Sequence, residues 1–408
     1  MPLPYYPILD DLVPVAGRYG IVGVDPRFYR ATWDNEHVED LTDYVISGSA
    51  SVTHDTSREA GNWILEASMT LDGWDRLRPF EDWIAPVWTV LYANGEYERQ
   101  QLGHYLVLDA PENRDELGGT VRLDARDSLY ALWSSGLRLS DVGLPQGGRI
   151  RKIREIITGA LVPGGPVGAT LRHSIVQPAD ENTSEWLGPW KDEDRRVQTI
   201  NRMLMAGAYF PLYSSPTGIL GIKPRAQLQA QQPLRLWYAN VPNDVVPIAG
   251  EAVDLRSVYG QPSPVVGQVN TSPSTARLVD EVVVLGSLGP GGGIATEPTL
   301  GGARATAGEV RKTVPVASIA NQAAAQTLAA SMLEMWLAEN TTVSLTVLPD
   351  PKFISIYGIV RCGVWDAQGR KVAVGKYLVK RVRYGMSVED PLMRVELGSL
   401  EDLAPEVF

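Results

Sequence analysis

The stretch KYLVKRVRYGMSVEDPLMRVEL, residues 376–397, shows most clearly what kind of fold to expect. It contains two candidate strands, Tyr377–Tyr384 and Leu392–Leu397, which are rich in apolar, β-branched and aromatic residues. Within the first, Arg381 and Arg383 recur with a period of two, which is typical of the solvent-facing side of a strand. The end of the chain is therefore predicted to form a β-sheet.

The rest of the last third continues this pattern around loops. The other strands expected here are Leu278–Leu285, Thr342–Leu348, Phe353–Val360 and Lys371–Val374. Two segments rich in Gly, Pro, Ser and Thr, Ser263–Ala276 and Ser287–Gly308, are expected to be long loops. The second is expected to be disordered because it has little apolar surface to bury. One alanine-rich helix, Ile319–Asn340, is expected between these loops and the last strands.

The first third is also predicted to be β. Its expected strands are Asp43–Ser47, Ser49–Asp55, Asn62–Thr70, Pro86–Ala93, Glu96–Gln101, Gly103–Asp109 and Thr120–Asp124. Asn94-Gly95 joins two of them and predicts a type I′ hairpin turn, since both residues tolerate a positive φ. Short helices are expected at Trp74–Phe80 and Arg126–Trp133.

The middle of the chain has a different character. Helices are expected at Gly148–Gly159 and Arg196–Ala206, where apolar residues recur on one face. A hairpin, Tyr209–Tyr213 with Ile219–Pro224, is expected to follow. The sequence thus predicts a mainly β fold with minor α, in which two antiparallel β domains (residues 1–140 and 245–408) flank a small α+β domain (residues 141–244).

Composition limits the classes of function. The chain has 37 Lys and Arg against 48 Asp and Glu, a net charge of −11, which disfavours a surface that binds duplex phosphates. Its single cysteine, Cys362, excludes an intrachain disulfide and is expected to be buried in a strand. Because no signal peptide or spanning segment is recognisable, we expect a soluble protein made in a cytoplasm, without membrane insertion.

No constellation of catalytic residues is recognisable. The four histidines, His37, His54, His104 and His173, have no metal-binding spacing, and His104 alternates with apolar residues as in a half-buried strand. The chain has neither a nucleophile elbow nor a phosphate-binding loop with its lysine. We therefore assign no catalytic or cofactor-binding residue, while a pair of carboxylates of the glycosidase type remains the main enzymatic alternative.

The densest group of carboxylates is formed by Asp34, Glu36, Glu39 and Asp40. Oxygen ligands of this kind suit a hard cation such as Ca²⁺, but no glycine-centred calcium loop accompanies them, and we assign no metal site. Trp186 and Trp190 lie in a polar segment, where anchoring of an interface or packing within a loop is a more economical role than sugar binding.

The order of these elements resembles the baseplate hub and tail-tip proteins of tailed bacteriophages. The segments that carry the resemblance are DLTDYVISGSASVTHD (40–55), EASMTL (66–71), YLVLDAPE (105–112), VRLDARDSLYAL (121–132), IANQAAAQTLA (319–329), TVSLTVLPDP (342–351) and residues 376–397. The resemblance covers most of the chain as a pattern, and none of its motifs is diagnostic alone. It extends to the hub fold at the base of secretion-system spikes.

The resemblance implies a non-enzymatic, trimeric baseplate hub whose two tube-like domains per chain imitate a six-fold ring. Such a hub joins a hexameric tail tube to a three-fold tip. The implied partners are further copies of the chain, a tail tube or distal tail ring protein, and a tip, fibre or tape-measure protein, with DNA only in transit. Because the sequence stops at Phe408, soon after its last strand, it resembles a minimal hub.

Three functions remain open at this point. The structural hub comes first, a hexameric tail-tip ring or receptor-binding tail protein comes second, and a cell-wall hydrolase comes third. For a ring, the acidic excess leads us to expect more Asp and Glu than Lys and Arg on the inner face, which would repel DNA in transit. The alternative is that the excess only keeps the subunit soluble before assembly.

Overall fold

The computed structural model describes most of the two ends of the chain and shorter stretches between them. These are residues 20–56, 61–108, 119–134, 153, 195–206, 209–223, 232–245, 255–259, 262–273, 281–286, 293–296, 311–316, 326, 329, 341–353 and 357–400. The fold is mainly β with minor α, as the sequence predicts. Among the described helices, none has the length and apolarity needed to cross a membrane.

Fourteen strands form one sheet, in the order β12-β16-β19-β18-β3-β4-β8-β7-β5-β1-β2. Off this path, β6 pairs with β5, β17 with β18, and β11 with β17. The strands are β1 Ile21–Ala31, β2 His37–Asp40, β3 Ser51–Asp55, β4 Trp63–Thr70, β5 Trp83–Tyr92, β6 Tyr97–Gln101, β7 Tyr105–Val107, β8 Thr120–Arg126, β11 Leu236–Ala239, β12 Asn270–Pro273, β16 Thr341–Val347, β17 Ile359–Trp365, β18 Lys371–Gly385 and β19 Met393–Ser399. All their pairings are antiparallel except that of β11 with β17.

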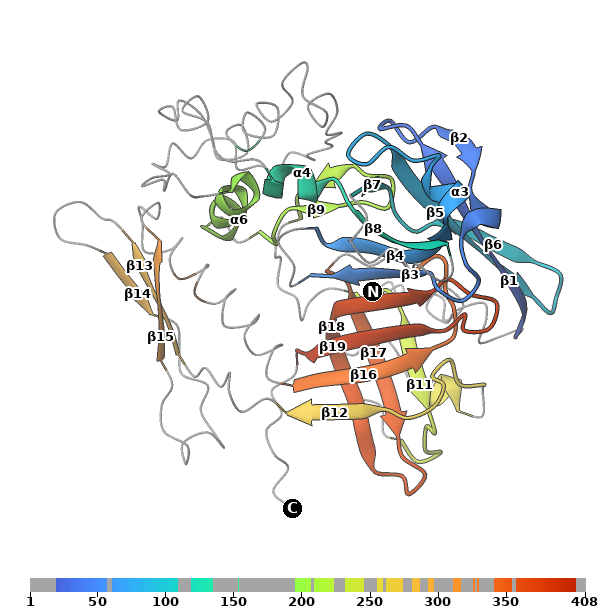
Figure 1. Cartoon of the computed structure of the whole chain (residues 1–408). Helices are drawn as coiled ribbons and strands as arrows, with labels where there is room; N and C mark the ends of the chain where they lie inside the picture. Colours follow the sequence, from blue (N-terminus) through green and yellow to red (C-terminus); the bar gives the residue numbers. More distant parts are fainter. Residues whose placement is uncertain are drawn as a thin grey trace, which may run out of the picture.

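The two ends of the chain meet within this sheet. Strands β1 to β8, the first β unit, and strands β11, β12 and β16 to β19, the second β unit, join where β3 pairs with β18. We call this contact the seam. Figure 1 shows β16, β19, β18, β3 and β4 side by side in one layer, with blue and red strands adjacent at the seam. Because main-chain hydrogen bonds cross the seam, the two units share one continuous backbone ladder.

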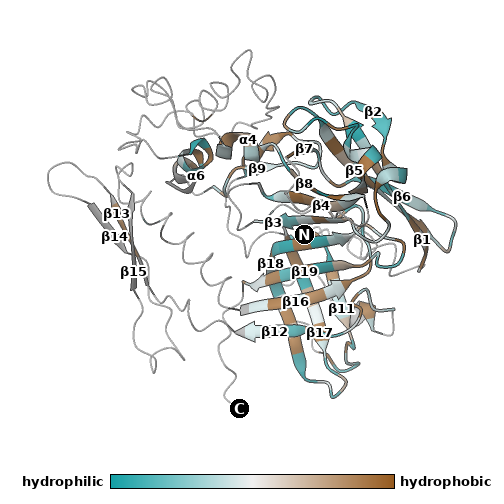
Figure 2. Cartoon of the chain, viewed as in Figure 1, coloured by the Kyte–Doolittle hydropathy of each residue, from teal (hydrophilic) through white to brown (hydrophobic). Residues whose placement is uncertain are grey.

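One hydrophobic core lies behind both units. Val52 in β3, Leu65 in β4 and Leu123 in β8 are fully buried in it, as are Val382 in β18 and Leu397 in β19. Their alternation with polar residues along each strand directs apolar side chains to one face, which brown and teal bands show in Figure 2. Burial of this shared face is the main driving force that holds the units together.

Smaller elements complete the described structure. They are η1 Thr42–Tyr44, α3 Leu71–Trp74, α4 Leu129–Ser134, α6 Arg196–Ala206, β9 Tyr213–Ser214, β10 Leu220–Gly221, η3 Leu255–Val258, β13 Glu281–Gly286, β14 Gly293–Thr296 and β15 Arg311–Val316. β9 and β10 form the hairpin expected after α6, and α6 has the predicted bounds. β13, β14 and β15 form a separate sheet, and β14 lies within the segment 287–308 that was expected to be a loop.

Several predictions of local structure were wrong. The strand expected at Asp43–Ser47 is instead the short helix η1, in which the Thr42 hydroxyl accepts the Phe28 N–H (3.0 Å). The helix expected to begin at Trp74 is α3, which ends there. The two strands expected between Lys371 and Tyr384 are one strand, β18, while β17 begins only at Ile359, near the end of the strand expected at 353–360.

The hairpin at Asn94-Gly95 is confirmed, but its turn differs from the predicted type. Gly95 has a φ of 86° and Asn94 is not among the residues with positive φ. The Gly95 N–H donates to the Tyr92 carbonyl, and the Tyr92 N–H donates to the Glu96 carbonyl. One left-handed glycine after a tight turn is the pattern of a longer hairpin loop, whereas a type I′ turn needs two positive φ values.

Some expectations lie outside the described residues. They are the helix at 148–159, nearly all of the helix at 319–340, most of the loop at 287–308, His173, Trp186 and Trp190.

Candidate functional site: the seam and the free sheet edges

Aromatic side chains back the seam on its buried face. Trp63 of β4 stacks on His54 of β3 at 4.5 Å and on Tyr384 of β18 at 6.1 Å between ring centroids. Trp88 of β5 meets the edge of Tyr384 at 5.7 Å. The Tyr384 hydroxyl donates to the Phe353 carbonyl (2.8 Å), and complete burial raises the pKa of Tyr384 above its ordinary value. The contact thus combines apolar burial with a satisfied polar group.

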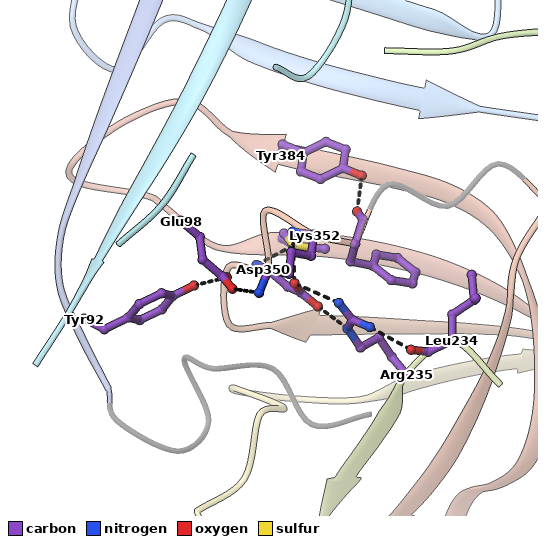
Figure 3. Close-up of polar contacts among 9 residues, drawn as sticks. Tyr92, Glu98, Leu234, Arg235, Asp350, Lys352 and Tyr384 are labelled. Atoms are coloured by element: carbon purple, nitrogen blue, oxygen red, sulfur yellow. Dashed lines mark hydrogen bonds and ion pairs between the residues drawn. The ribbon is translucent and has the colours of Figure 1, made fainter. Parts of the chain in front are cut away.

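A polar bridge joins the same two units at a second place. Glu98 of β6 accepts the Tyr92 hydroxyl (2.7 Å) and pairs with Lys352 (2.5 Å), which belongs to the second β unit (Figure 3). Beside it, Arg235 pairs with Asp350 at 2.5 Å, and only 3% of the Asp350 side chain is exposed. Figure 3 shows these groups as one chain of contacts, which we call the polar bridge. Two hydrogen bonds join Arg235 to the Asp350 carboxylate, and such a pair fixes the relative orientation of the two side chains as well as their distance.

The β9–β10 hairpin lies against the first β unit near the seam. The Trp63 indole N–H donates to the Ser214 carbonyl (2.9 Å), and the Ser128 hydroxyl donates to the Gly218 carbonyl (3.1 Å). Gly218 has a φ of +80°, and a Cβ there would lie 2.6 Å from the His104 ring. Only glycine fits this close approach without strain.

The same hairpin segment also touches the second β unit. Phe210 stacks on Tyr357 at 4.3 Å, and the Lys223 ammonium donates to the Tyr357 carbonyl (2.9 Å). Burial lowers the pKa of Lys223. Residues 209–223 therefore contact both units and act as a clamp between them.

One buried carboxyl lies between the sheet and this clamp. Asp127 is fully buried and accepts the Trp63 N–H (2.9 Å) and the Leu129 N–H (3.0 Å). Burial raises the pKa of Asp127 to about 7, because desolvation of the charge outweighs the backbone hydrogen bonds that favour it. Asp127 is therefore the described carboxyl most sensitive to pH near neutrality.

Among the described strands, the sheet ends in edges that no other described strand covers. β2 and β12 are the terminal strands of the path, and β6 and β11 each pair with one neighbour in the described structure. Near two of these edges, Val38 of β2 and Tyr97 of β6 are large side chains exposed at 56% and 67%. Unpaired N–H and C=O groups on such edges can pair with another chain.

Those residues singled out from the sequence that the structure describes are not brought together into a reactive site. His104 is more buried than expected: it stacks on Trp83 at 4.4 Å, and its Nε2 lies 2.9 Å from the Thr32 carbonyl. Cys362 is buried in β17 as predicted, and burial raises its pKa, which leaves an unreactive thiol. The basic side chains Arg381 and Arg383 lie on the outer side of β18, as predicted.

Two carboxylates of the β1–β2 cluster form ion pairs with arginines. Glu39 pairs with Arg30 (3.1 Å) and Arg76, and Asp40 lies 3.7 Å from Arg27. In the part of the chain that the structure describes, no group of three or more His, Cys, Asp or Glu could hold a metal ion. The pairing of β3 with β18 is the part of the candidate site that local sequence patterns did not predict.

Solved structures with a similar fold include tail proteins. A tail protein from Neisseria meningitidis has 12% identity and a TM-score of 0.60, over 94% of this chain and 98% of that one. The chain has the fold of phage tail proteins. The 43 kDa tail protein of prophage MuSo2 from Shewanella oneidensis (12% identity, TM-score 0.56) covers 92% of this chain, with 98% of its own length matched. A prophage tail protein from Listeria monocytogenes (12% identity, TM-score 0.51) covers 91%, with 94% of its own length matched.

No family model matches the chain, and no curated protein matches it in sequence. The similarity to tail proteins is therefore one of fold. It extends over both β units and the segment between them, since nearly the whole chain is covered. The predicted resemblance to tail-tip proteins is confirmed at this level.

Proposed function

We propose that this chain is a structural hub of a phage tail tip, in which three copies form a ring that adapts a six-fold tail tube to a three-fold tip. The observation that carries the proposal is the seam, which makes two β units into one sheet with free edge strands. A three-fold ring continues a six-fold tube only if each chain offers two equivalent units. In this proposal the seam holds the two units of one chain together, so that each chain contributes both.

The parts of the chain have distinct roles in this proposal. Residues 1–140 and 245–408 are the two tube-like β domains, and residues 141–244 form the small domain that includes the clamp and, at its end, the strand β11, which pairs with β17 of the second β domain. The partners are two further copies, a tail tube or distal ring protein on one side, and a tip, fibre or tape-measure protein on the other. DNA passes through during ejection, and the location is the virion tail tip. The role is non-enzymatic.

The symmetry of assembled tails tests this proposal. We expect three copies at the tail tip in electron-microscopic reconstructions, with the two β domains superposable as one type. Six copies would favour a hexameric ring instead, and a peripheral position would favour a receptor-binding protein. Cleavage of purified peptidoglycan by the chain, abolished by one carboxylate substitution, would establish the hydrolase alternative.

The free edges allow a sharper test of the joint between copies. Val38→Lys adds a charge to the β2 edge, where Val38 is exposed at 56%, and should convert the ring into monomers. Val388→Lys is the matched control, because Val388 is equally exposed (65%) but lies between β18 and β19, away from the terminal strands. Molar mass by light scattering distinguishes them. A ring that survives Val38→Lys would show that β2 is not the joint.

A further inference from the structure

One face of the sheet around the seam carries polar and charged side chains in register across neighbouring strands. In register across β16, β19, β18 and β3, Ser344 lies beside Glu396, Glu396 beside Arg381, and Arg381 beside Asp55. Across β3, β4 and β8 the same face carries Ser51, Glu66 and Asp124 side by side. We call this face of the six strands the polar wall. It is opposite the buried face that holds the aromatic core.

The polar wall is not a hydrophobic docking surface. Its uncharged positions include short hydroxyl side chains such as Ser344 and Ser68, while its apolar members Ile64 and Leu378 are only 3% and 7% exposed. None of the large exposed apolar side chains of the described residues lies on these six strands. A surface of this kind offers little area for stable binding of another protein.

The charges of the polar wall compensate one another. Five arginines, Arg122, Arg126, Arg381, Arg383 and Arg394, share it with four carboxylates, Asp55, Glu66, Asp124 and Glu396. Four of the arginines have a carboxylate partner. The pairs are Arg122–Glu66 (3.1 Å), Arg126–Asp124 (2.9 Å), Arg381–Glu396 (3.3 Å) and Arg394–Asp390 (2.7 Å).

Arg383 is the exception. Among the residues that the structure describes it has no carboxylate partner, and it lies directly opposite Arg394. The arginines and carboxylates of the wall leave one excess positive charge, and β18 adds Lys376 and Lys380, whereas the chain as a whole carries a net charge of −11. An inner face of this kind would differ from the acidic one expected from net charge alone.

We propose that the polar wall faces the channel and that its carboxylates are there to mask the arginines from DNA in transit. This inference rests on the proposed function. An unpaired arginine attracts phosphates by releasing counterions, which would stall a moving duplex. An arginine that already holds a carboxylate has no net charge to offer beyond about 8 Å at physiological salt. A wall whose arginines are mostly paired with carboxylates holds the duplex less tightly than one whose arginines are all unpaired.

Neutralising the carboxylates should reveal the masked arginines. The triple variant Glu66→Gln/Asp124→Asn/Glu396→Gln removes the partners of Arg122 and Arg126 and the nearer of the two partners of Arg381, whose other partner is Asp55 at 4.0 Å, without adding bulk. The matched control Asp72→Asn/Asp75→Asn/Glu81→Gln changes the net charge equally at exposed positions outside the six strands. Fluorescence anisotropy with a short labelled duplex at low salt measures binding by the purified full chain.

We expect the triple variant to bind at least tenfold more tightly than the natural chain and the control. Its affinity should fall with salt with a slope near 3, since each phosphate contact contributes about 0.9. Adding Arg122→Gln should weaken binding again. Equal binding by the triple variant and its control would show an effect of net charge only, and tight binding by the natural chain would show an unmasked surface. Either result overturns the proposal.

A second measurement places the wall in the particle. The chain's cysteine is buried, so Thr346→Cys on the wall can be labelled selectively with a bulky maleimide. Labelled tails should assemble with normal symmetry and release DNA more slowly, whereas a label at Asp75→Cys should have no such effect. Normal release from wall-labelled tails would refute the channel position. Failure of the unmodified chain to form a ring would instead refute the proposed function and leave the binding contrast intact.

Discussion

The seam and the polar bridge join the same two β units by different physics. At the seam, Trp63 and Tyr384 are fully buried, and backbone pairing of β3 with β18 adds to their packing. At the polar bridge, Glu98 and Lys352 form an ion pair in which the lysine side chain is 67% exposed. Burial of aromatic area contributes more than a partly solvated ion pair. The comparison indicates that the seam supplies most of the stability of the contact between the units, and that the polar bridge mainly fixes their relative orientation.

The largest effect on stability is expected from removing Trp63, the aromatic side chain at the centre of the seam. Trp63→Ala deletes the contacts with His54 and Tyr384 and the hydrogen bond to Ser214, and should lower the free energy of unfolding by about 3–5 kcal/mol. Urea titration followed by circular dichroism measures this change. Trp63→Phe should cost less, since it keeps most of the ring packing. A loss below 1 kcal/mol for Trp63→Ala would mean that the seam is not the main cohesive contact.

The buried part of the polar bridge should show the next largest effect. Arg235→Ala leaves the Asp350 carboxylate, 3% exposed, without its cation, and breaking such a buried pair costs about 3 kcal/mol or more. Replacing both partners, as Arg235→Met/Asp350→Leu, should recover much of this loss because no uncompensated charge remains. Urea titrations of the two variants check the pair. A double variant as unstable as Arg235→Ala would show that the ion pair itself, and not the stranded charge, carries the stability.

The sequence predicted the strands on either side of the seam but not the seam itself. β4, β8 and β19 were found within two residues because alternation along a strand is local. β1 was missed because Pro26 and two nearby charges interrupt its pattern. The choice of β18 as the partner of β3 depends on contacts between opposite ends of the chain, which no local periodicity records.

For the same reason, only those features of the candidate site that depend on a single strand could be predicted from the sequence. The outward position of Arg381 and Arg383 followed from their period of two along β18. The carboxylate partners of Arg381, Asp55 and Glu396, belong to other strands, so these ion pairs could not be predicted from the sequence, where the net charge alone led to the expectation of an acidic inner face. The burial of Asp127 likewise depends on β4, from which it accepts the Trp63 N–H across 64 residues of sequence.

Asp127 accepts the Trp63 N–H at the seam, so its ionisation should make the stability of the seam depend on pH. Its pKa of about 7 in the folded protein lies above the ordinary aspartate value of 3.8, so the folded state holds this proton more tightly than the unfolded state. Its contribution to stability is therefore full below about pH 4 and is lost as pH rises to about 7, by a few kcal/mol at most. Urea titrations at a series of pH values measure it. Asp127→Asn should flatten this part of the profile, and an unchanged profile would show that the carboxyl is already ionised in the folded protein.

The exposed end of the polar bridge should give the smallest effect. Lys352→Ala removes the ion pair with Glu98 but leaves the Tyr92 hydroxyl donating to the same carboxylate. Because the lysine side chain is largely solvated, the loss in unfolding free energy should stay below about 1 kcal/mol and shrink with added salt. Lys371→Ala, at an exposed lysine on the end of β18, is the matched control. The informative readout is amide exchange in β6: if the bridge supplies direction, Lys352→Ala speeds exchange at Tyr97–Gln101 while exchange in β3 and β18 is unchanged. Equal acceleration on both sides of the seam would show that the bridge, despite its exposure, contributes to cohesion as well.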